Sequence, residues 1–319
     1  MASAVAREVV GASRRPPGRP RRNDVLGGAT KRRRDNWAGL TMSSPAVLVL
    51  FVFTLFPALY AFYLSLFRWS LLNHMHFVGL HNFAALFTTR LFWIAAGNTV
   101  AFAAIVVPTQ TVVALVLASI LNQNLPARGF FRLAFFFPAI SSSAVISIIF
   151  LWIYNKFGIL NGFLRYLGVS GPNWLTNTHF ALPAIMFLNV WTTSGYLMVV
   201  FLAALQSIPQ DLYEAASLDG AGPWRRFRNV TVPLLRPATF FIVVMGLIGT
   251  LQMFDQSFIL SSGTGGPIHS TTTVVLLIYQ YIFSYGKVGY GAAATVVLFA
   301  FTMGATLMVN RYLGKPVDA

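Results

Sequence analysis

Few residues in this 319-residue chain have types and a spacing that suit chemistry, and most of those lie in residues 208–237. This segment, IPQDLYEAASLDGAGPWRRFRNVTVPLLRP, contains three of the eight acidic residues of the chain: Asp211, Glu214 and Asp219. Carboxylates are stabilised near the start of a helix by the positive end of its dipole. We therefore expect a short helix that has Pro209 in its first turn.

The second half of this segment predicts a turn and another short helix. Gly220 can take the left-handed conformation that ends a helix. Pro223 suits the start of the next helix, and Pro233 is expected to end it. A helix–turn–helix of this kind on the surface suits docking to a partner more than catalysis. A plain connecting loop is the alternative.

The rest of the chain contains no recognisable motif of an enzyme active site. The sequence has no Cys, which excludes thiol nucleophiles, disulfides and thiolate metal sites. Neither Gly-Lys pair, at 286–287 and 314–315, is followed by the Ser or Thr of a phosphate-binding loop, and there is no G-x-S-x-G elbow. We expect a non-catalytic chain that binds no cofactor itself and cannot hydrolyse ATP alone.

The histidines do not form a recognisable metal-binding motif. They are His74, His76, His81, His179 and His269. The first three cluster in one predicted loop, where a metal site is conceivable, but no carboxylate lies near them in sequence and no H-E-x-x-H motif is present. We expect a solvated loop and no bound metal.

The composition indicates a membrane protein. Hydrophobic residues make up 56% of the chain and charged residues 10%, against about a quarter charged residues in soluble domains. Uncharged apolar stretches near the length of about 20 residues that a membrane helix needs recur along the chain. We predict an all-α polytopic fold with six transmembrane helices, at residues 44–67, 93–121, 133–155, 180–206, 238–260 and 289–309.

One apolar segment, residues 271–285, is left outside these spans. Its run TTTVVLLIYQYIF is short for a span and suits an interfacial or a re-entrant helix. With six spans, most of the 23 Lys and Arg residues lie on one side of the membrane. The positive-inside rule then places both termini and residues 208–237 in the cytoplasm.

The two ends of the chain are predicted to lie outside the membrane domain. Residues 1–43 contain RRPPGRPRR and KRRRD and predict a disordered basic cytoplasmic arm. Nucleic-acid binding is the alternative for such an arm, but a basic flank beside a span is commoner, and we expect contact with membrane lipid and not with nucleic acid. The membrane domain is predicted to cover residues 44–311, and a short tail residues 312–319.

Residues 208–237 resemble the coupling loop of permease subunits from binding-protein-dependent ABC importers, specifically the carbohydrate type that includes maltose and glycerol-3-phosphate importers. The family pattern E-A-A-x3-G-x12-P is present as Glu214, Ala215, Ala216, Gly220 and Pro233. The carbohydrate-type extension D-G-A-G-P-W begins at Asp219. The runs FDQSFILSSGTGGP at 254–267 and GYGAAAT at 289–295 are also similar, and the resemblance covers residues 44–312.

This resemblance implies a type I ABC importer permease architecture and a set of partners. The two-helix loop would sit in a cleft of a separate ATPase, whose closure rocks the spans between inward- and outward-facing states. The docking residues would be Glu214, Ala215, Ala216, Asp219, Gly220 and Pro233. The implied partners are a second permease subunit, two copies of a P-loop ATPase that holds ATP and Mg²⁺, and an extracytoplasmic substrate-binding protein at a prokaryotic plasma membrane.

Polar residues within the spans point to a substrate path. Such residues are costly in a membrane unless they face protein or a water-filled cavity. One face of the fourth predicted span carries Asn189, Thr192, Thr193 and Tyr196, and one face of the fifth carries Gly246, Gly249, Thr250, Met253 and Ser257, with Gln252 and Gln256 beside it. Helix packing through Gly and Thr is the alternative.

The resemblance also implies which of these residues meet a sugar. Maltose-type permeases contact sugar from the two helices beside the coupling loop, at positions that match Thr192, Thr193, Tyr196, Thr250 and Met253. We expect Tyr196 to stack on a pyranose face. No Lys or Arg lies within the predicted spans, whereas an anionic substrate would need a cation.

Asp255 is the one acidic residue inside a predicted span. It lies about 27 Å along the helix from Pro237, near the outer edge of a hydrocarbon core of about 30 Å. An interfacial carboxylate is one interpretation, and a binding or gating role is the other. A proton relay would prefer an acid at the midplane. We expect ATP-driven import of a sugar or sugar derivative, and an ion-coupled secondary transporter is the alternative.

Overall fold

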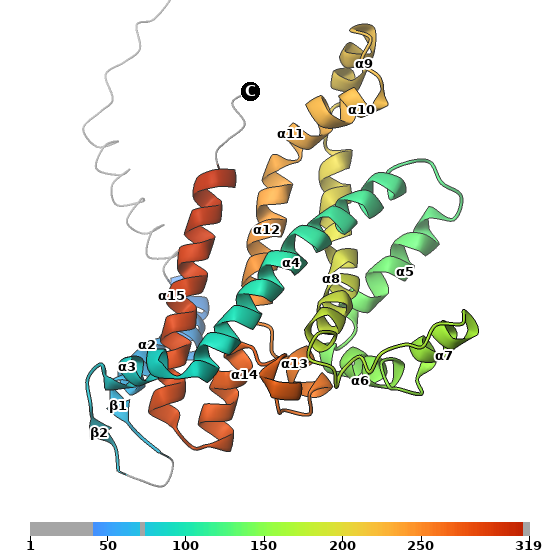
Figure 1. Cartoon of the computed structure of the whole chain (residues 1–319). Helices are drawn as coiled ribbons and strands as arrows, with labels where there is room; N and C mark the ends of the chain where they lie inside the picture. The colour runs from blue at the N-terminus through green and yellow to red at the C-terminus, as the bar shows by residue number, and fades with distance from the viewer. Residues whose placement is uncertain (1–40, 71–73, 315–319) are drawn as a thin grey trace, which may run out of the picture. The chain divides into compact units, whose positions relative to one another are not determined.

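The computed structural model describes residues 41–70 and 74–314, which are mostly helical (Figure 1). Contacts divide the chain into two compact units, Met1–Tyr60 and Ala61–Ala319. Most of the predicted basic arm and of the predicted tail lies outside the described residues. The elements in chain order are η1 (Phe51–Leu55), α2 (Phe56–Ser65), β1 (Phe67–Arg68), β2 (His76–Phe77), α3 (His81–Thr88), α4 (Arg90–Leu121), α5 (Arg128–Ile140), α6 (Ser143–Ile153), α7 (Ile159–Tyr166), α8 (Ala181–Gln206), α9 (Gln210–Leu218), α10 (Pro223–Arg226), η2 (Phe227–Thr231), α11 (Val232–Leu234), α12 (Arg236–Leu251), α13 (Asp255–Leu260), η3 (Pro267–His269), α14 (Val274–Tyr279), η4 (Gln280–Ser284) and α15 (Val288–Leu313).

The described part of the first unit is a single apolar helix. It begins within the predicted arm at Thr41, passes through the π-helical turn η1 and continues as α2. All side chains of residues 41–60 are exposed. The whole run Thr41–Ser65 is 25 residues long and apolar enough to cross a membrane, which confirms the first predicted span by length and composition.

The second unit is a helical bundle built around α4 and α8. These helices, the run Arg236–Leu260 and α15 are each long and apolar enough to span a membrane, in agreement with four predicted spans. The helices α12 and α5 both pack against α8, and α12 also packs against α4. Buried side chains such as Phe201, Leu235 and Ile242 join α8 to α12 at the end that leads into residues 208–235.

The third predicted span, residues 133–155, is not one straight helix. It consists of α5 and α6, which meet at an angle of 98°. The break falls at Ser141 and Ser142, which have extended backbone conformations and follow Pro138. Serine hydroxyls compete with the helical hydrogen bonds of the backbone, and here Ser141 Oγ donates to Phe137 O (3.1 Å). As a result, α6 and α7 run across the lower end of α5 and α8 (Figure 1).

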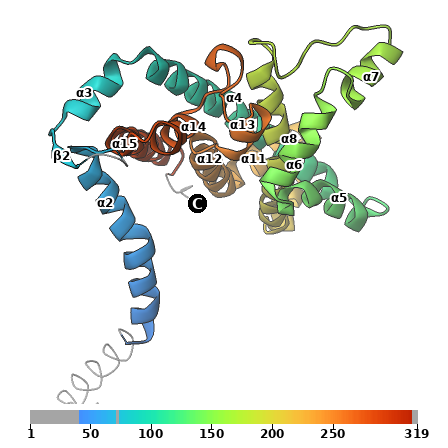
Figure 2. The same cartoon turned by 90° about the horizontal axis from the view of Figure 1, so that it is seen from below.

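The fifth span contains a second interruption. α12 ends at Leu251 and α13 begins at Asp255, and the residues between them leave the helical conformation. Phe254 has φ −129° and ψ −61°. α13 packs against α6 and α8, and Figure 2 shows these helices from below.

The short apolar segment 271–285 is packed into the bundle. It forms α14 and the π-helical turn η4, and α14 packs against α4 and α15. Val274, Leu276 and Leu277 are at most 4% exposed. A helix that lay on the membrane surface would leave one face exposed to lipid or water, so the burial of this segment fits the re-entrant interpretation.

One strand pair departs from the all-α expectation. Strands β1 and β2 pair antiparallel, with Phe67 opposite Phe77 and Arg68 opposite His76. Asn82 supports this turn because its Nδ2 donates to the carbonyl oxygens of Ser65 (2.8 Å) and Phe67 (2.9 Å). The pair is only two residues long and does not change the fold class.

Candidate coupling and translocation sites

The predicted docking segment begins with a helix that ends in a glycine turn. α9 is closed by a Schellman motif, in which Ala221 N donates to Ala216 O (2.9 Å) and Gly220 N donates to Ser217 O (3.0 Å). Gly220 has φ +75°, a conformation that costs side-chain-bearing residues energy. The predicted left-handed position is therefore present at Gly220. Pro209 is the N-cap of α9, one residue before the predicted first turn.

The second arm of the segment folds back against α9. The hydroxyl groups of Tyr213 and Thr231 lie 2.9 Å apart, and Arg226 Nη1 donates to Ser217 Oγ (3.0 Å). Thr231 is buried although most of the segment is exposed. These bonds fix the two arms as one element, unlike a plain connecting loop.

Pro233 does not end the second helix, contrary to the prediction. Pro223 does open α10, which runs through the π-helical turn η2 into α11, and α11 contains Pro233. Proline lacks an N–H group and clashes with the carbonyl four residues before it in a regular α-helix. A wider π-helical turn before the proline relieves this conflict. The helix is interrupted at Leu235, which is 1% exposed and anchors the segment to the core.

The predicted docking residues contribute to an exposed surface. Glu214, Ala215, Asp219, Gly220 and Pro233 are exposed, and Ala216 is partly buried. Leu218 is 90% and Trp224 72% exposed beside them. A Cβ atom at Gly220 would meet nothing within 4 Å. Exposed large apolar side chains that gather on one surface are typical of a contact site for another protein.

Both helix interruptions open onto one polar pocket of about 260 Å³. Its lining residues are Ser143, Asn189, Gly249, Gln252, Met253, Phe254, Asp255 and Gln256. Ser143 begins α6 after the bend, and Gln252 to Phe254 form the interruption after α12. Non-helical backbone within a membrane domain is tolerated where it lines a cavity. The structure thus brings together six residues that the sequence placed on or beside the path: Asn189, Gly249, Gln252, Met253, Asp255 and Gln256.

Two amide side chains join the walls of this pocket. Asn189 Nδ2 on α8 donates to Gln256 Oε1 on α13 (3.0 Å). Asn189 Oδ1 is buried and has no protein partner among the described residues. Because an unpaired buried acceptor is costly, this oxygen is a ready partner for a hydroxyl group of a ligand.

The remaining residues that the resemblance implies for sugar contact, Thr192, Thr193, Tyr196 and Thr250, do not line this pocket. The hydroxyl groups of Thr192 and Thr250 are bonded to carbonyl oxygens of their own helices, and both residues are buried. Thr193 Oγ1 donates to Gln110 Oε1 on α4 (2.6 Å). Tyr196 is 44% exposed on α8. Contact of these four residues with a substrate stays a prediction.

Asp255 lies at a helix start and not within a continuous helix. It opens α13, directly after the interruption, and its side chain is exposed. The N-terminal end of a helix favours a carboxylate. This position explains how an acidic residue is accommodated in an otherwise apolar span.

Sequence reasoning missed two residues of this region. Gln110 is 1% exposed and connects α4 to α8 through Thr193. A Cβ atom at Gly246 would lie 2.3 Å from Gln110 Nε2, so α12 also packs closely on this side chain. The signal was a glutamine inside a long apolar run. Ser143 was missed because the bend that exposes it was not predicted.

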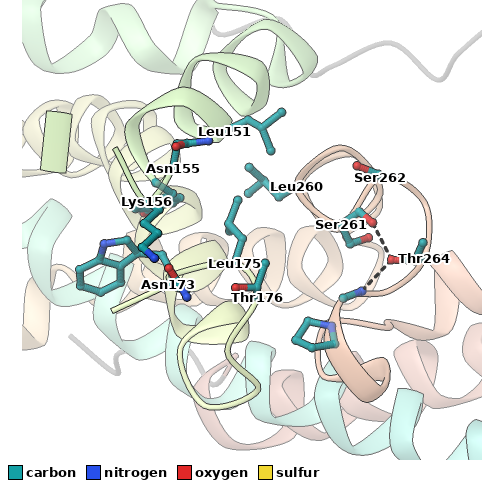
Figure 3. A pocket seen from close by; sticks show the side chains of 14 residues that line it. Leu151, Asn155, Lys156, Asn173, Leu175, Thr176, Leu260, Ser261, Ser262 and Thr264 are labelled. Carbon is teal, nitrogen blue, oxygen red and sulfur yellow. Dashed lines mark hydrogen bonds between the residues drawn. The ribbon is translucent and has the colours of Figure 1, made fainter. Parts of the chain in front are cut away.

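A larger cavity of about 780 Å³ lies at the end of the bundle where α8 begins, opposite the docking segment. Figure 3 shows Leu151, Leu175 and Leu260 toward its centre. Asn155, Lys156 and Asn173 lie on one side of them, and Ser261, Ser262 and Thr264 on the other. Trp174 also lines the cavity, and its Nε1 donates to Asn161 Oδ1 (2.9 Å). This mixture of apolar and polar groups, in which Lys156 is the charged member, fits a solute entrance or a protein contact.

The family described as "Binding-protein-dependent transport system inner membrane component" matches residues 110–314, well over half of the chain. The chain belongs to this family. It is a multi-pass inner-membrane permease, and the family implies a substrate-binding protein and an ATPase as partners.

Characterised relatives of the permease cover most of its length. It is 38% identical to the lactose transport system permease protein LacF of Rhizobium radiobacter over 86% of this chain and 92% of that protein. It is 34% identical to the sulfoquinovosyl glycerol permease SmoG of Agrobacterium fabrum (88% and 91%). It is 35% identical to the trehalose/maltose permease MalF of Thermococcus litoralis (85% and 91%).

The fold of the permease is similar to that of a solved transporter chain. A chain of a bacterial alginate ABC transporter, crystallised with an alginate pentasaccharide-bound periplasmic protein, superposes with a TM-score of 0.74. The match covers 88% of this chain and 95% of the other at 21% identity. At this identity the likeness supports the fold of the permease.

The histidines of the permease offer no cluster for a metal. Within residues 41–70 and 74–314, no three His, Asp or Glu side chains lie close enough together to hold an ion.

Proposed function

We propose that this permease imports an uncharged, hydroxyl-rich solute, a sugar or sugar derivative. The observation that carries the proposal is the pocket between the two helix interruptions. Its polar side chains are the amides of Asn189, Gln252 and Gln256, the Ser143 hydroxyl and the Asp255 carboxylate, and no cation lines it. Amide and carboxylate groups match the hydroxyl groups of a sugar, which both donate and accept hydrogen bonds.

The relatives support a sugar or sugar derivative as the solute, whereas its lack of charge is inferred from the pocket lining alone. Their names refer to lactose, to trehalose and maltose, and to sulfoquinovosyl glycerol, and the solved transporter is described with an alginate pentasaccharide. An ion-coupled secondary transporter receives no support from this family. The path residues Thr192, Thr193, Tyr196 and Thr250 would then act above or below the pocket, at a different stage of transport.

Energy would enter through the docking segment of residues 208–237. The exposed side chains of Leu218 and Trp224 offer an apolar contact, and Glu214 offers a charge-assisted hydrogen bond to a cationic or N–H donor of an ATPase. The open space around Gly220 lets a partner backbone approach closely. The permease chain itself would be non-catalytic, and ATP and Mg²⁺ would belong to the ATPase.

The complete importer would contain two permease chains, two ATPase copies and a binding protein. Support for this stoichiometry comes from the resemblance of residues 208–237 to the coupling loop of carbohydrate-type importers. We place the docking segment and both termini in the cytoplasm, following the positive-inside rule. The 780 Å³ cavity at the opposite end then faces the binding protein.

A charge reversal in α9 tests the docking. We expect a tagged wild-type chain, purified from its native membrane in mild detergent, to bring a P-loop ATPase with it. Glu214→Lys should lose that ATPase, because it replaces an exposed acceptor with a cation. The matched control is Asp211→Lys, which reverses another exposed acid about one turn earlier on the same helix and outside the E-A-A pattern.

Identification by mass spectrometry decides the result. Recovery of the ATPase with wild type and Asp211→Lys, but not with Glu214→Lys, supports the proposal. If no ATPase accompanies wild type in detergents that preserve such complexes, or if both variants lose it equally, the assigned docking role of Glu214 is wrong.

A further inference from the structure

Two cations and a histidine surround one pocket at the end of the bundle where α15 begins. The pocket has a volume of about 420 Å³ and is lined by Arg68, Trp69, Ser70, His81, Asn82, Ala85, Tyr285, Lys287 and Tyr290. The side chains of Arg68, His81 and Lys287 are exposed. α15 begins at this end and runs to the end of the bundle that carries the docking segment (Figure 1). The pocket is therefore separate from both the docking segment and the 260 Å³ pocket.

Hydrogen bonds hold the walls of this pocket in place. Ser70 and Lys287 form an antiparallel backbone bridge, and Gly289 N donates to Trp69 O (3.3 Å). Tyr290 OH lies 2.7 Å from Thr89 Oγ1 and 3.1 Å from Ala85 O. These bonds tie the chain after α2, the helix α3 and the start of α15 into one rigid frame. The cations are thus displayed from a fixed scaffold and not from a loose loop.

The permease supplies no described anion for these cations. The acidic residues of residues 41–70 and 74–314 are Asp211, Glu214, Asp219 and Asp255. Three of them lie in the docking segment, and Asp255 lines the other pocket. The first turn of α15 adds the positive end of a 26-residue helix beside Lys287. The pocket is therefore suited to an anion from outside the chain.

The surroundings of the pocket are those of a membrane boundary. The first span ends at Ser65, shortly before Arg68, and the last span begins at Val288, directly after Lys287. The nearby side chains of Phe77 and Leu80 are 69% and 71% exposed. Trp69, Tyr285 and Tyr290 are residues of the kinds that gather at the level of lipid headgroups. Exposed apolar residues beside unpaired cations fit a lipid better than a protein partner in water.

We propose that this pocket binds the phosphate group of an anionic phospholipid. Arg68 and Lys287 would donate hydrogen bonds to the phosphate oxygens, with His81 and the Tyr285 hydroxyl as further partners. The apolar side chains at the rim would contact the acyl chains. A bound lipid would connect the chain after α2 to the start of α15, and so stabilise the frame around the pocket.

Native mass spectrometry of the delipidated full-length chain with its co-purified partners tests this proposal. Equal amounts of phosphatidylglycerol and phosphatidylcholine with the same acyl chains are added. We expect wild type to retain phosphatidylglycerol preferentially and Arg68→Gln/Lys287→Gln to lose about 30-fold of that preference, as two cations at about 1 kcal/mol each predict. The control Arg90→Gln removes an exposed cation at the start of α4, outside the pocket.

Four results would overturn the proposal. The double variant could keep the preference, or Arg90→Gln could lose it to the same extent, which would indicate diffuse surface charge. Displacement of the lipid by inorganic phosphate alone would assign the site to a phosphate from solution. Loss of the binding protein from the double variant without any change in lipid preference would assign the cations to an acidic protein surface. An exchange that keeps the charges, Arg68→Lys/Lys287→Arg, should retain the lipid and so controls for misfolding.

Discussion

Substitution of Gly220 tests whether backbone conformation controls energy coupling. With φ +75°, this glycine closes α9, and a Cβ atom there would meet nothing within 4 Å. A side chain therefore causes no clash within the permease, and the expected effect comes from the left-handed conformation itself. That conformation costs about 1–2 kcal/mol for a residue with a Cβ, which corresponds to a loss of roughly 5- to 30-fold in the population of the native turn.

A graded series separates this effect from other causes. Asn tolerates the left-handed conformation, Ala does so less well, and β-branched Val is the least suitable. We expect uptake per ATP hydrolysed to fall in the order Gly220→Asn, Gly220→Ala, Gly220→Val, while the amount of protein in the membrane stays constant. The control is Gly222→Ala, because Gly222 lies two residues away, has φ −66°, and an added Cβ atom there would also meet nothing within 4 Å.

The assay measures solute uptake and ATP hydrolysis in vesicles that contain the complete importer. Unchanged coupling in Gly220→Val would refute the reasoning. Equal losses in Gly220→Val and Gly222→Ala would also refute it, because they would show that any added side chain at the turn disturbs the partner, whatever its backbone conformation.

Two further substitutions test the pocket and the packing of the bundle. Asn189→Leu removes the hydrogen bond to Gln256 and the unpaired oxygen beside the pocket. We expect the KM for uptake to rise about tenfold, which corresponds to the loss of one or two hydrogen bonds to the solute. An unchanged KM would show that Asn189 is not part of the site. Gly195→Ala should abolish recovery of folded permease in size-exclusion chromatography, because an added Cβ atom would lie within 2 Å of Phe135 O on α5. The control Gly249→Ala, where an added Cβ atom has free space, should be recovered normally, and equal yields of the two variants would contradict the packing of α5 on α8.

The positions of the spans could be read from the sequence because burying apolar side chains in lipid dominates the energetics of a membrane helix. The predicted limits of the helix that became α8, residues 180–206, differ from Ala181–Gln206 by one residue. The change in backbone direction within a span could not be predicted in the same way. The window 133–155 carries no charge and is apolar on average, so hydropathy gave no sign of the 98° bend. The signal was local, in Pro138 and the serines that follow it.

The docking segment shows which features local conformational preferences of the residues predict and which they do not. The left-handed cap at Gly220 follows from glycine's access to positive φ, and it was predicted. The continuation of the helix through Pro233 was not, because a π-helical turn that accommodates a proline depends on the backbone before it. Which polar residues face the pocket was also beyond the sequence. Thr250 satisfies its hydroxyl group within α12, whereas Asn189 reaches across to α13.

The continuous helix α8 is a lever arm between the two sites of the permease. It runs 26 residues without interruption, and its last residue, Gln206, is followed closely by the docking segment. Asn189 lies about 26 Å along the helix axis from Gln206, at a rise of 1.5 Å per residue. A rotation of about 5° at the docking end would displace Asn189 by about 2 Å, enough to break a hydrogen bond of normal length. A small movement of the ATPase surface would therefore be sufficient to change the affinity of the pocket for its solute.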